Sequence, residues 1–192
     1  MRLMQAVDPR ASSILTFWFG AGGRDKRWFE KSEAFDAEVR RRFLGLHEEG
    51  ARGTLASWKG RPGDCLALIV LLDQFPRNMF RGTPRAFATD APALDAARHA
   101  LAQGYDRAMQ PLERMFVYLP FEHAESLAEQ ERACELTAPL DAFAETDDVH
   151  RYARAHRDVI ARFGRFPHRN AILGRQSTAE EQEFLEGPGS SF

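Results

Sequence analysis

Two short segments place the same pair of polar residues directly after a Phe-Pro step. Residues 75–78 read Phe-Pro-Arg-Asn, and residues 166–170 read Phe-Pro-His-Arg-Asn. Proline disfavours helical angles in the residue before it, so each step is expected to end a helix. Arginine is a planar fork of donors and asparagine donates and accepts, which suits carboxylates, phosphates or exposed backbone. The first elbow thus carries Arg77 and Asn78, and the second elbow carries His168, Arg169 and Asn170.

An aspartate precedes the first elbow. Asp73 lies four residues before Arg77, at the end of an apolar segment. A negative charge in the last turn of a helix opposes the helix dipole, so a nearby cation should compensate it. One interpretation is a structural Asp73–Arg77 pair that pins the following loop, and the other is an arginine held ready for an anionic ligand. Because structural ion pairs are common, the sequence favours the first.

A histidine and two glutamates follow Pro120. We expect Pro120 to end one helix and to place Glu122, His123 and Glu125 in the first turn of the next. Histidine beside carboxylates can perform general acid–base catalysis or bind a metal. The spacing, however, matches neither His-Glu-x-x-His nor Glu-x-x-His, and the Pro-Cys-x-x-Cys partner of a zinc deaminase is absent. We therefore predict no metal site and no cofactor.

Further polar candidates come late in the chain. His156 lies on the apolar stripe of a predicted helix over residues 149–163. Such a histidine is more often a hydrogen-bonded core residue than a ligand. The arginines beyond this helix exceed what one helix end needs: Arg165, Arg169 and Arg175. They could satisfy free carbonyls, or they could form an anion pocket or a charged partner surface, and the sequence supports both equally.

The elements that must position these residues are helices. Apolar residues recur every three or four positions through most of the chain, and no alternating pattern typical of strands is present. Ser32, Thr89 and Thr178 have the features of helix starts, and residues 66–72 predict a central helix packed on every side. The fold class is therefore all-α, with about six to eight helices in a bundle or a short stack of antiparallel pairs.

Composition narrows the classes of function. The chain has 192 residues and a net charge of −2, which favours neither nucleic acid nor an anionic membrane as a partner. No apolar run approaches the ~20 residues of a membrane-spanning helix. Cys65 and Cys134 lack the spacing of zinc or redox motifs, so we expect buried thiols and a cytoplasmic location. We expect one helical domain over residues 1–186 and a flexible tail over residues 187–192.

Together these segments resemble a family of bacterial proteins, domain-of-unknown-function family 924. The resemblance covers nearly the whole chain and rests on Phe-Trp-Phe-Gly at 17–20, residues 71–78, Phe87 with Asp90, and residues 118–125, 163–170, 173–175 and 177–178. The family usually has Ser-Glu after the histidine, whereas this chain has Ala124-Glu125, which counts against a serine-based role there. The resemblance implies a tetratricopeptide-like array of helices. It implies no established reaction, cofactor or partner.

Three functions remain open from the sequence. The first, which we favour, is a binding protein whose polar surface, made by the two elbows, holds a small anionic molecule or a peptide or protein partner. The second is a hydrolase or lyase that uses His123 or His156 with nearby carboxylates as acid and base. The third is a structural or adaptor protein without a small-molecule site. Convergence of both elbows and His123 on one pocket would favour the first two.

Overall fold

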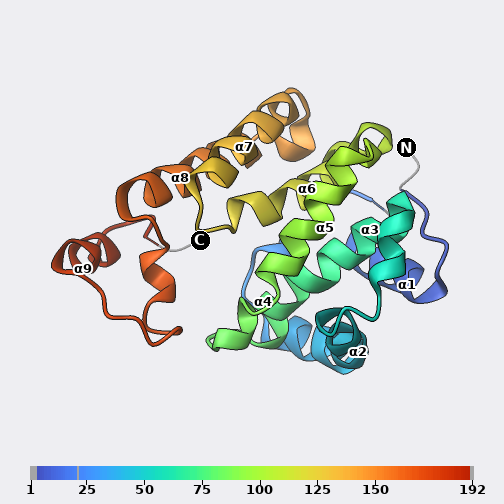
Figure 1. Ribbon diagram of the computed structural model, residues 1–192, viewed down its shortest axis with the longest axis horizontal. Helices are drawn as coiled ribbons and strands as arrows, with labels where there is room; N and C mark the ends of the chain where they lie inside the picture. The colour runs from blue at the N-terminus through green and yellow to red at the C-terminus, as the bar shows by residue number, and fades with distance from the viewer. Residues whose placement is uncertain (1–3, 21, 191–192) are drawn as a thin grey trace.

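The helices of the chain follow one another with short links and no strands among the described residues (Figure 1). The computed structural model describes residues 4–20 and 22–190. The end of the predicted tail, residues 191–192, lies outside this range. The α-helices are α1 (Pro9–Phe19), α2 (Glu33–Ala51), α3 (Pro62–Ile69), α4 (Phe75–Met79), α5 (Asp90–Ala102), α6 (Pro111–Glu122), α7 (Leu127–Thr137), α8 (Val149–Phe163) and α9 (Ala179–Glu186).

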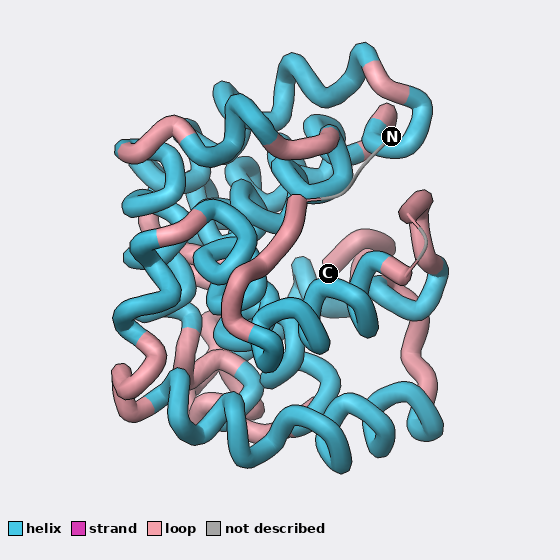
Figure 2. Tube along the Cα trace, turned by 90° about the vertical axis from the view of Figure 1, so that its right-hand side faces the viewer, coloured by secondary structure: helices cyan, strands magenta, loops and turns pink. Residues whose placement is uncertain are grey.

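Short helical turns fill many of the links. A π-helical turn, Val70–Gln74, joins α3 to α4 without a break, so these three elements form one continuous rod. The 3₁₀ turns are Lys26–Trp28, Ala56–Gly60, Pro84–Ala86, Tyr105–Ala108, Ala138–Ala142, Ala144–Thr146 and Pro167–Arg169. The all-α prediction is confirmed, since almost every described segment is helical (Figure 2).

Helix α5 packs on α6, α6 on α7, and α7 on α8. At the other end of the molecule, α1 packs on α3 and α2 packs on α4. The rod formed by α3, the π turn and α4 lies between these two groups, because α3 also contacts α5 and α6 (Figure 1). The predicted central helix is confirmed, since every residue from Leu66 to Leu72 is buried.

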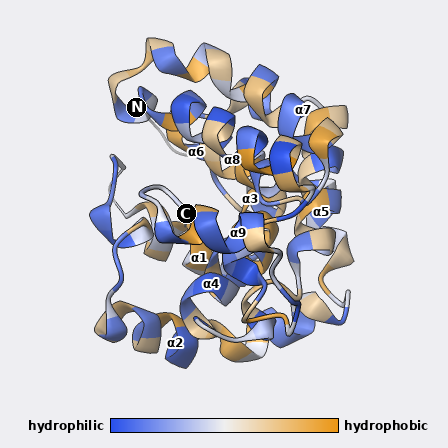
Figure 3. Cartoon of the chain, turned by 90° about the vertical axis from the view of Figure 1, so that its left-hand side faces the viewer, coloured by the Kyte–Doolittle hydropathy of each residue, from blue (hydrophilic) through white to orange (hydrophobic). Residues whose placement is uncertain are grey.

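Aromatic side chains fill the space around the central rod. Trp18 meets Phe75 and Phe116 edge to face, with ring centroids 5.5 and 5.6 Å apart. This arrangement places the positive edge of one ring against the negative face of another. Hydrophilic and hydrophobic residues alternate along the outer helices α2 and α9 (Figure 3). A second, smaller apolar cluster of Val159, Ile160 and Phe166 packs below the second elbow.

The helix starts that the sequence predicts are confirmed where a side chain caps them. The Ser32 hydroxyl accepts a hydrogen bond from the amide of Phe35 at 3.3 Å. Thr178 and Glu181 form a reciprocal capping box at α9. Such caps satisfy amides that have no partner within the helix. Neither cysteine is in a disulfide, and Cys65 is buried. None of the helices in the described part of the chain has the length and apolarity to cross a membrane.

The chain before α1 is fastened to the start of α3. The amides of Val7 and Asp8 donate to the same Asp64 carboxylate oxygen at 2.7 and 3.1 Å. The backbone of Gln5 therefore lies against Gly63, where a Cβ atom would be only 2.2 Å from the Gln5 carbonyl oxygen. We expect Gly63→Ala to lower the free energy of unfolding by about 1–3 kcal/mol in urea denaturation, because it overpacks this contact.

Gly60→Ala is the matched control, because a Cβ atom there meets nothing within 4 Å. It should retain nearly the full stability of the unsubstituted protein. Equal stability of the two variants would contradict the close contact between Gly63 and the segment before α1.

Candidate functional site

The first elbow differs from its prediction. The expectation that Phe75-Pro76 ends a helix is wrong, because the chain passes through the π turn and continues as α4. In the π turn the amide of Phe75 bonds to the carbonyl of Val70, five residues earlier. Pro76 then stands at the start of α4, where its missing amide hydrogen costs little. The elbow is therefore part of a rigid rod rather than the start of a loop.

Two carbonyls near the π turn accept hydrogen bonds from side chains. The Leu72 carbonyl accepts from the Thr89 hydroxyl, and the Asp73 carbonyl accepts from Nη1 of Arg77, each at 2.6 Å. A π turn shifts the normal ladder and exposes carbonyls, which is one reason such turns recur at functional sites. Here the shift fixes Arg77 on the rod.

The second polar segment also differs from its prediction. Pro120 does not end a helix, since α6 continues through it to Glu122. Proline removes only its own amide bond and crowds one carbonyl, and the next bonds form again: the amide of His123 reaches the Leu119 carbonyl at 3.0 Å. Glu122 is thus in the last turn of α6, His123 caps that helix, and Glu125 lies in the link to α7. None of the three lies in a first helical turn.

The helix before the second elbow ends at Phe163, as predicted, although Gly164 rather than the Phe-Pro step ends it. Helix α8 stops at Phe163, and Gly164 follows in the left-handed region with φ of 70°. Glycine enters this region without the steric cost that a Cβ atom adds. Phe166 and Pro167 then lead into the 3₁₀ turn that carries Arg169.

The two elbows meet at Asp90, the first residue of α5. Arg77 grips the carboxylate with both terminal nitrogens at 2.9 and 3.2 Å, and Nη1 of Arg169 reaches it at 3.2 Å. Both guanidinium groups also lie over the ring of Phe87, at 5.8 and 4.6 Å from its centroid. Bidentate pairs and contact with an aromatic face are the contacts that arginine makes best. Asp90 and Phe87 therefore bring together two segments about ninety residues apart in the sequence, Arg77 and Arg169.

His123 bonds to the buried carboxylate of Asp73. Its Nδ1 lies 2.7 Å from Oδ1 of Asp73, and the side chain of Gln74 donates to the other oxygen at 2.6 Å. Burial alone would raise the pKa of Asp73, but His123 and Arg77 outweigh it and hold that pKa below its usual range. Burial and Arg77 lower the pKa of His123. Asp73 is therefore ionised, and Nδ1 of His123 carries the hydrogen that it donates to Asp73.

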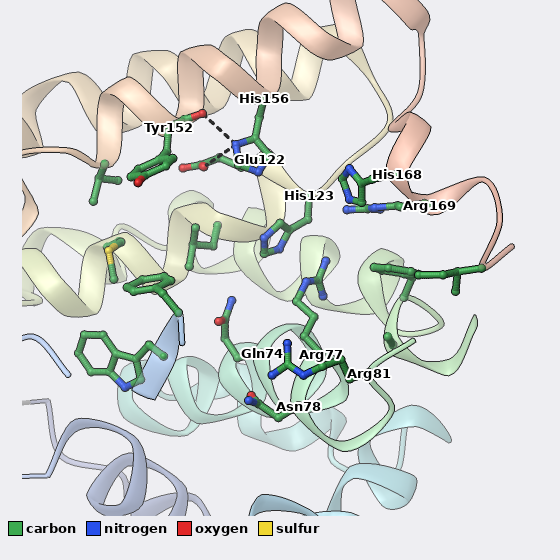
Figure 4. Close-up of a pocket in the computed structure, with 18 of the residues that line it drawn as sticks. Gln74, Arg77, Asn78, Arg81, Glu122, His123, Tyr152, His156, His168 and Arg169 are labelled. Atoms are coloured by element: carbon green, nitrogen blue, oxygen red, sulfur yellow. Dashed lines mark hydrogen bonds and ion pairs between the residues drawn. The ribbon is translucent and has the colours of Figure 1, made fainter. Parts of the chain in front are cut away.

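Glu122 and His156 form a second buried pair beside the first (Figure 4). Nδ1 of His156 donates to the Tyr152 carbonyl at 2.8 Å and lies 3.7 Å from a Glu122 oxygen. Burial lowers the pKa of His156 to about 3, so its ring is neutral at neutral pH. Burial and the Asp73 charge raise the pKa of Glu122 to about 8. Glu122 is consequently a neutral acid at neutral pH.

These groups line one cavity of about 570 Å³. The view into it shows Glu122 and His156 above His123, Arg77 below it, and His168 with Arg169 to its right (Figure 4). Apolar and aromatic side chains complete its wall: Trp28, Phe29, Phe87, Met115, Leu119 and Tyr152. The arginines in its wall, among the residues that the structure describes, are Arg24, Arg77, Arg81 and Arg169. Among the described residues, no group of three or more histidine, cysteine or acidic side chains is arranged to hold a metal.

The sequence profile of the DUF924 family, bacterial proteins of unknown function, matches residues 14–189. The chain is a member of the DUF924 family. It is also similar to the solved structure of a protein of unknown function from Agrobacterium tumefaciens, with 46% sequence identity and a TM-score of 0.85. That similarity covers 92% of this chain and 97% of the other. No curated protein matches the chain.

In this DUF924 protein several predicted site residues lie outside the cavity wall. Arg175 grips Glu125 with both terminal nitrogens at 2.7 and 2.9 Å, and Glu125 also accepts from the amide of Phe166 at 2.9 Å. Arg165 pairs with Glu181 at 2.6 Å, and Asn170 donates to the same carboxylate at 3.2 Å. These contacts fasten the link after α6 and helix α9 to the second elbow.

The remaining predicted residues do face the cavity. The wall includes Arg77, Asn78, Glu122, His123, His156, His168 and Arg169, and the buried Asp73 lies behind His123. Asn78 also donates to Asp36 at 2.8 Å. Burial and the charge of Arg169 lower the pKa of His168 to about 4. One cavity of the DUF924 fold thus gathers both elbows and both histidine pairs.

Sequence reasoning missed several residues of this cavity. Gln74 was adjacent to a predicted residue and has the donor that an ionised Asp73 requires. Asp90 was named with Phe87 in the family resemblance but not as a site residue, although it is the shared partner of both elbows. Arg81 and Arg24 pair with Asp36 and Asp148 at the cavity. No local pattern in the sequence indicates these long-range pairs.

Proposed function

We propose that the cavity binds a small organic anion with an apolar part. The observation that carries this proposal is the incomplete pairing of Arg169. Its side chain is almost fully buried, it makes one hydrogen bond to Asp90, and its Nε has no partner among the described residues. A buried donor without an acceptor costs free energy that a bound anion would recover.

The charge distribution supports an anion. Burial and the neighbouring Arg77 lower the pKa of Arg169 to about 10. Arg77 pairs with both Asp73 and Asp90. Asp90 is therefore shared by two arginines, and its single negative charge only partly neutralises Arg169. An anion placed beside Arg169 would relieve the repulsion between the two guanidinium groups. Carboxylates and phosphates both fit the arginine fork.

The size and lining of the cavity support a small molecule. Its volume of about 570 Å³ falls within the range of ordinary small-molecule sites. Phe87, Met115 and Leu119 give it apolar wall between the charged groups. A ligand with an anionic end and an apolar body would satisfy both parts of this surface.

The alternatives from the sequence each have an observation behind them. Arg165 and Arg175 each bind an internal glutamate carboxylate through two nitrogens, which supports a structural role for those two. The pair of His123 with the buried Asp73 supports an enzyme of the hydrolase or lyase type. A protein or peptide partner would have to enter the same cavity with an acidic group. The two free cysteines support the expected cytoplasmic location.

We expect Arg169→Gln to weaken binding of small anions about 10- to 150-fold. A charge-assisted hydrogen bond contributes about 1.5–3 kcal/mol, and this substitution removes the charge while Arg77 still pairs with Asp90. The probes are inorganic phosphate, succinate and phenylacetate, measured by calorimetry. A probe present at about 100 times its dissociation constant should also stabilise the protein by about 2.7 kcal/mol.

Arg98→Gln is the matched control, because Arg98 is an exposed arginine paired with Glu129 outside the cavity wall. Its affinity for each probe should equal that of the unsubstituted protein. Binding that persists undiminished in a folded Arg169→Gln protein would contradict the proposed anion site. Absence of binding of all three probes to the unsubstituted protein would contradict it as well.

A further inference from the structure

We propose that the cavity is catalytic, with His123 as general base, Asp73 as its positioning residue and Glu122 as general acid, and that it hydrolyses esters of small dicarboxylic acids. The inference rests on the proposed anion site for recognition of the free carboxylate. The supporting observation is the geometry of two neighbouring residues in the cavity wall. His123 is paired with Asp73, and Glu122 is paired with His156.

The ring of His123 is oriented as a base requires. Asp73 accepts from Nδ1 at 2.7 Å, and Gln74 holds the other oxygen of that carboxylate. The fixed tautomer leaves the lone pair on Nε2, on the side of the ring away from Asp73. The side chain is 13% exposed, while Asp73 is completely buried. Solvent thus reaches the ring and not the carboxylate, which is the arrangement of an oriented general base.

One oxygen of the Glu122 carboxyl group is available to a ligand. Oε1 is buried in the wall of the cavity and has no hydrogen-bond partner among the described residues. The other oxygen, Oε2, lies 3.7 Å from Nδ1 of His156, which already donates to the Tyr152 carbonyl. The His156 ring beside it is neutral, and burial together with the Asp73 charge raises the pKa of Glu122 to about 8, so Glu122 retains a proton that it can give to a leaving group.

Other charged and titratable groups face His123 from every side. They are Asp73 and Arg77 on the central rod, Asp90 on α5, Glu122 on its own helix, His156 on α8, and His168 and Arg169 on the second elbow. Burial and the charge of Arg77 lower the pKa of His123, whereas Asp73 and Asp90 act in the opposite direction. The ring is therefore a free base near neutral pH and can still hold a proton during the reaction.

The lining of the cavity favours water as the nucleophile. No serine, threonine or cysteine is present among the described residues that line it. Water attacks the ester carbonyl carbon while Nε2 of His123 takes a proton from it, and the carbonyl electron pair moves to oxygen. When the carbonyl re-forms, the bond to the alcohol breaks and the alcohol oxygen takes the proton of Glu122. The proton that His123 took from water is then transferred to Glu122, which restores both groups. In total, one water and one ester give one acid and one alcohol.

The free carboxylate determines the substrate class. The Nε of Arg169 has no partner among the described residues, and Arg169 lines the cavity together with Arg77, with which it shares Asp90. A dicarboxylic monoester can place its carboxylate there and its ester group at His123 within the one cavity. A neutral ester lacks the group that Arg169 recognises.

The test uses the 4-nitrophenyl and methyl monoesters of succinic acid. The unsubstituted protein should hydrolyse both, and His123→Ala should lower kcat for both about 10²- to 10⁴-fold. Added imidazole should restore part of the activity of His123→Ala, because it supplies the missing base. His99→Ala is the control, since His99 contacts Tyr105 and is absent from the cavity wall.

The other two roles have their own readouts. Asp73→Asn should lower kcat with little change in KM, and it should move the rise of kcat to lower pH because the anion that favours protonation of His123 is gone. Glu122→Gln should reduce hydrolysis of the methyl ester at least tenfold more than that of the 4-nitrophenyl ester, whose leaving group needs less help from an acid. 4-Nitrophenyl acetate should be a poorer substrate, because it has no carboxylate for Arg169.

The outcomes separate catalysis from binding. No hydrolysis by the unsubstituted protein above the rate of His123→Ala would overturn the catalytic proposal, and so would a folded His123→Ala protein with full activity. If hydrolysis is absent but succinate binds, and that binding is lost in Arg169→Gln, the proposed anion site is retained and the catalytic proposal is rejected. If succinate does not bind, the proposed function fails as well.

Discussion

Asp73→Ala is expected to lower the free energy of unfolding by about 3–5 kcal/mol. Asp73 is completely buried, and it accepts from His123 and Gln74 while Arg77 lies 3.6 Å from its carboxylate. Removing the carboxylate leaves the partly buried guanidinium of Arg77 with less opposing charge, and it leaves the donors of His123 and Gln74 without an acceptor. These penalties exceed the loss of any single contact. Urea denaturation at pH 7 measures the change.

The control is Asp95→Ala, which removes an aspartate from the surface of α5. Asp95 pairs with Lys59 and is 65% exposed, so its removal should change stability by at most about 1 kcal/mol. A similar small effect at both positions would show that the Asp73 network does not hold the central rod. Asp73→Asn keeps the volume and one acceptor, so it should cost less than Asp73→Ala.

The sequence was sufficient to predict elements whose causes are local. Apolar spacing predicted α8 from Val149 to Phe163, and the capping residues Ser32 and Thr178 marked their helices correctly. Each of these signals lies within a few residues of the feature that it controls. The two proline rules failed for a physical reason. Pro76 and Pro120 remove one amide each. The Thr89 hydroxyl donates to the Leu72 carbonyl, four residues before Pro76, and the helical bonds form again after Pro120.

The sequence predicts several residues of the candidate site, but it does not predict which of them pair across long distances in the chain. His123, Glu122, Arg77 and Arg169 have chemistry that any reading of the sequence would notice. Their partners are distant in the sequence: Asp73 lies 50 residues from His123, and Asp90 lies 79 residues from Arg169. Such pairs follow from the packing of α5, α6 and the second elbow on the central rod. Local patterns contain no information about that packing.

Asp73, behind the cavity wall, and Glu122, in the wall, are both buried carboxyl groups, but their neighbours shift their pKa values in opposite directions. Asp73 is surrounded by donors from His123, Gln74 and Arg77, and these stabilise its anion. Glu122 is equally buried, but its nearest histidine is neutral and its nearest charge is the anion of Asp73. The neighbours therefore decide which group is the acid and which supports the base. A pair of acidic groups with separated pKa values is the usual basis for acid–base roles.

Glu122→Gln is expected to make the protein more stable than the unsubstituted chain at pH 9, and to leave the two similar at pH 5. The folded pKa of Glu122 is about 8, well above its ordinary value of 4.5. The folded state therefore binds the proton more tightly than the unfolded state does. This stabilisation is fully present below pH 4.5 and is lost as the pH rises from there through 8.

The predicted difference at pH 9 is on the order of 4 kcal/mol, because each pKa unit corresponds to about 1.4 kcal/mol. Glutamine copies the shape of the neutral acid and cannot ionise, so subtracting the two unfolding free energies at each pH cancels the other titrating groups. Glu131→Gln, at an exposed position on α7, is the control for removing a glutamate carboxyl. A difference between Glu122→Gln and the unsubstituted protein that stays constant from pH 5 to pH 9 would mean that Glu122 is ionised throughout. It would then have no proton to give to a leaving group.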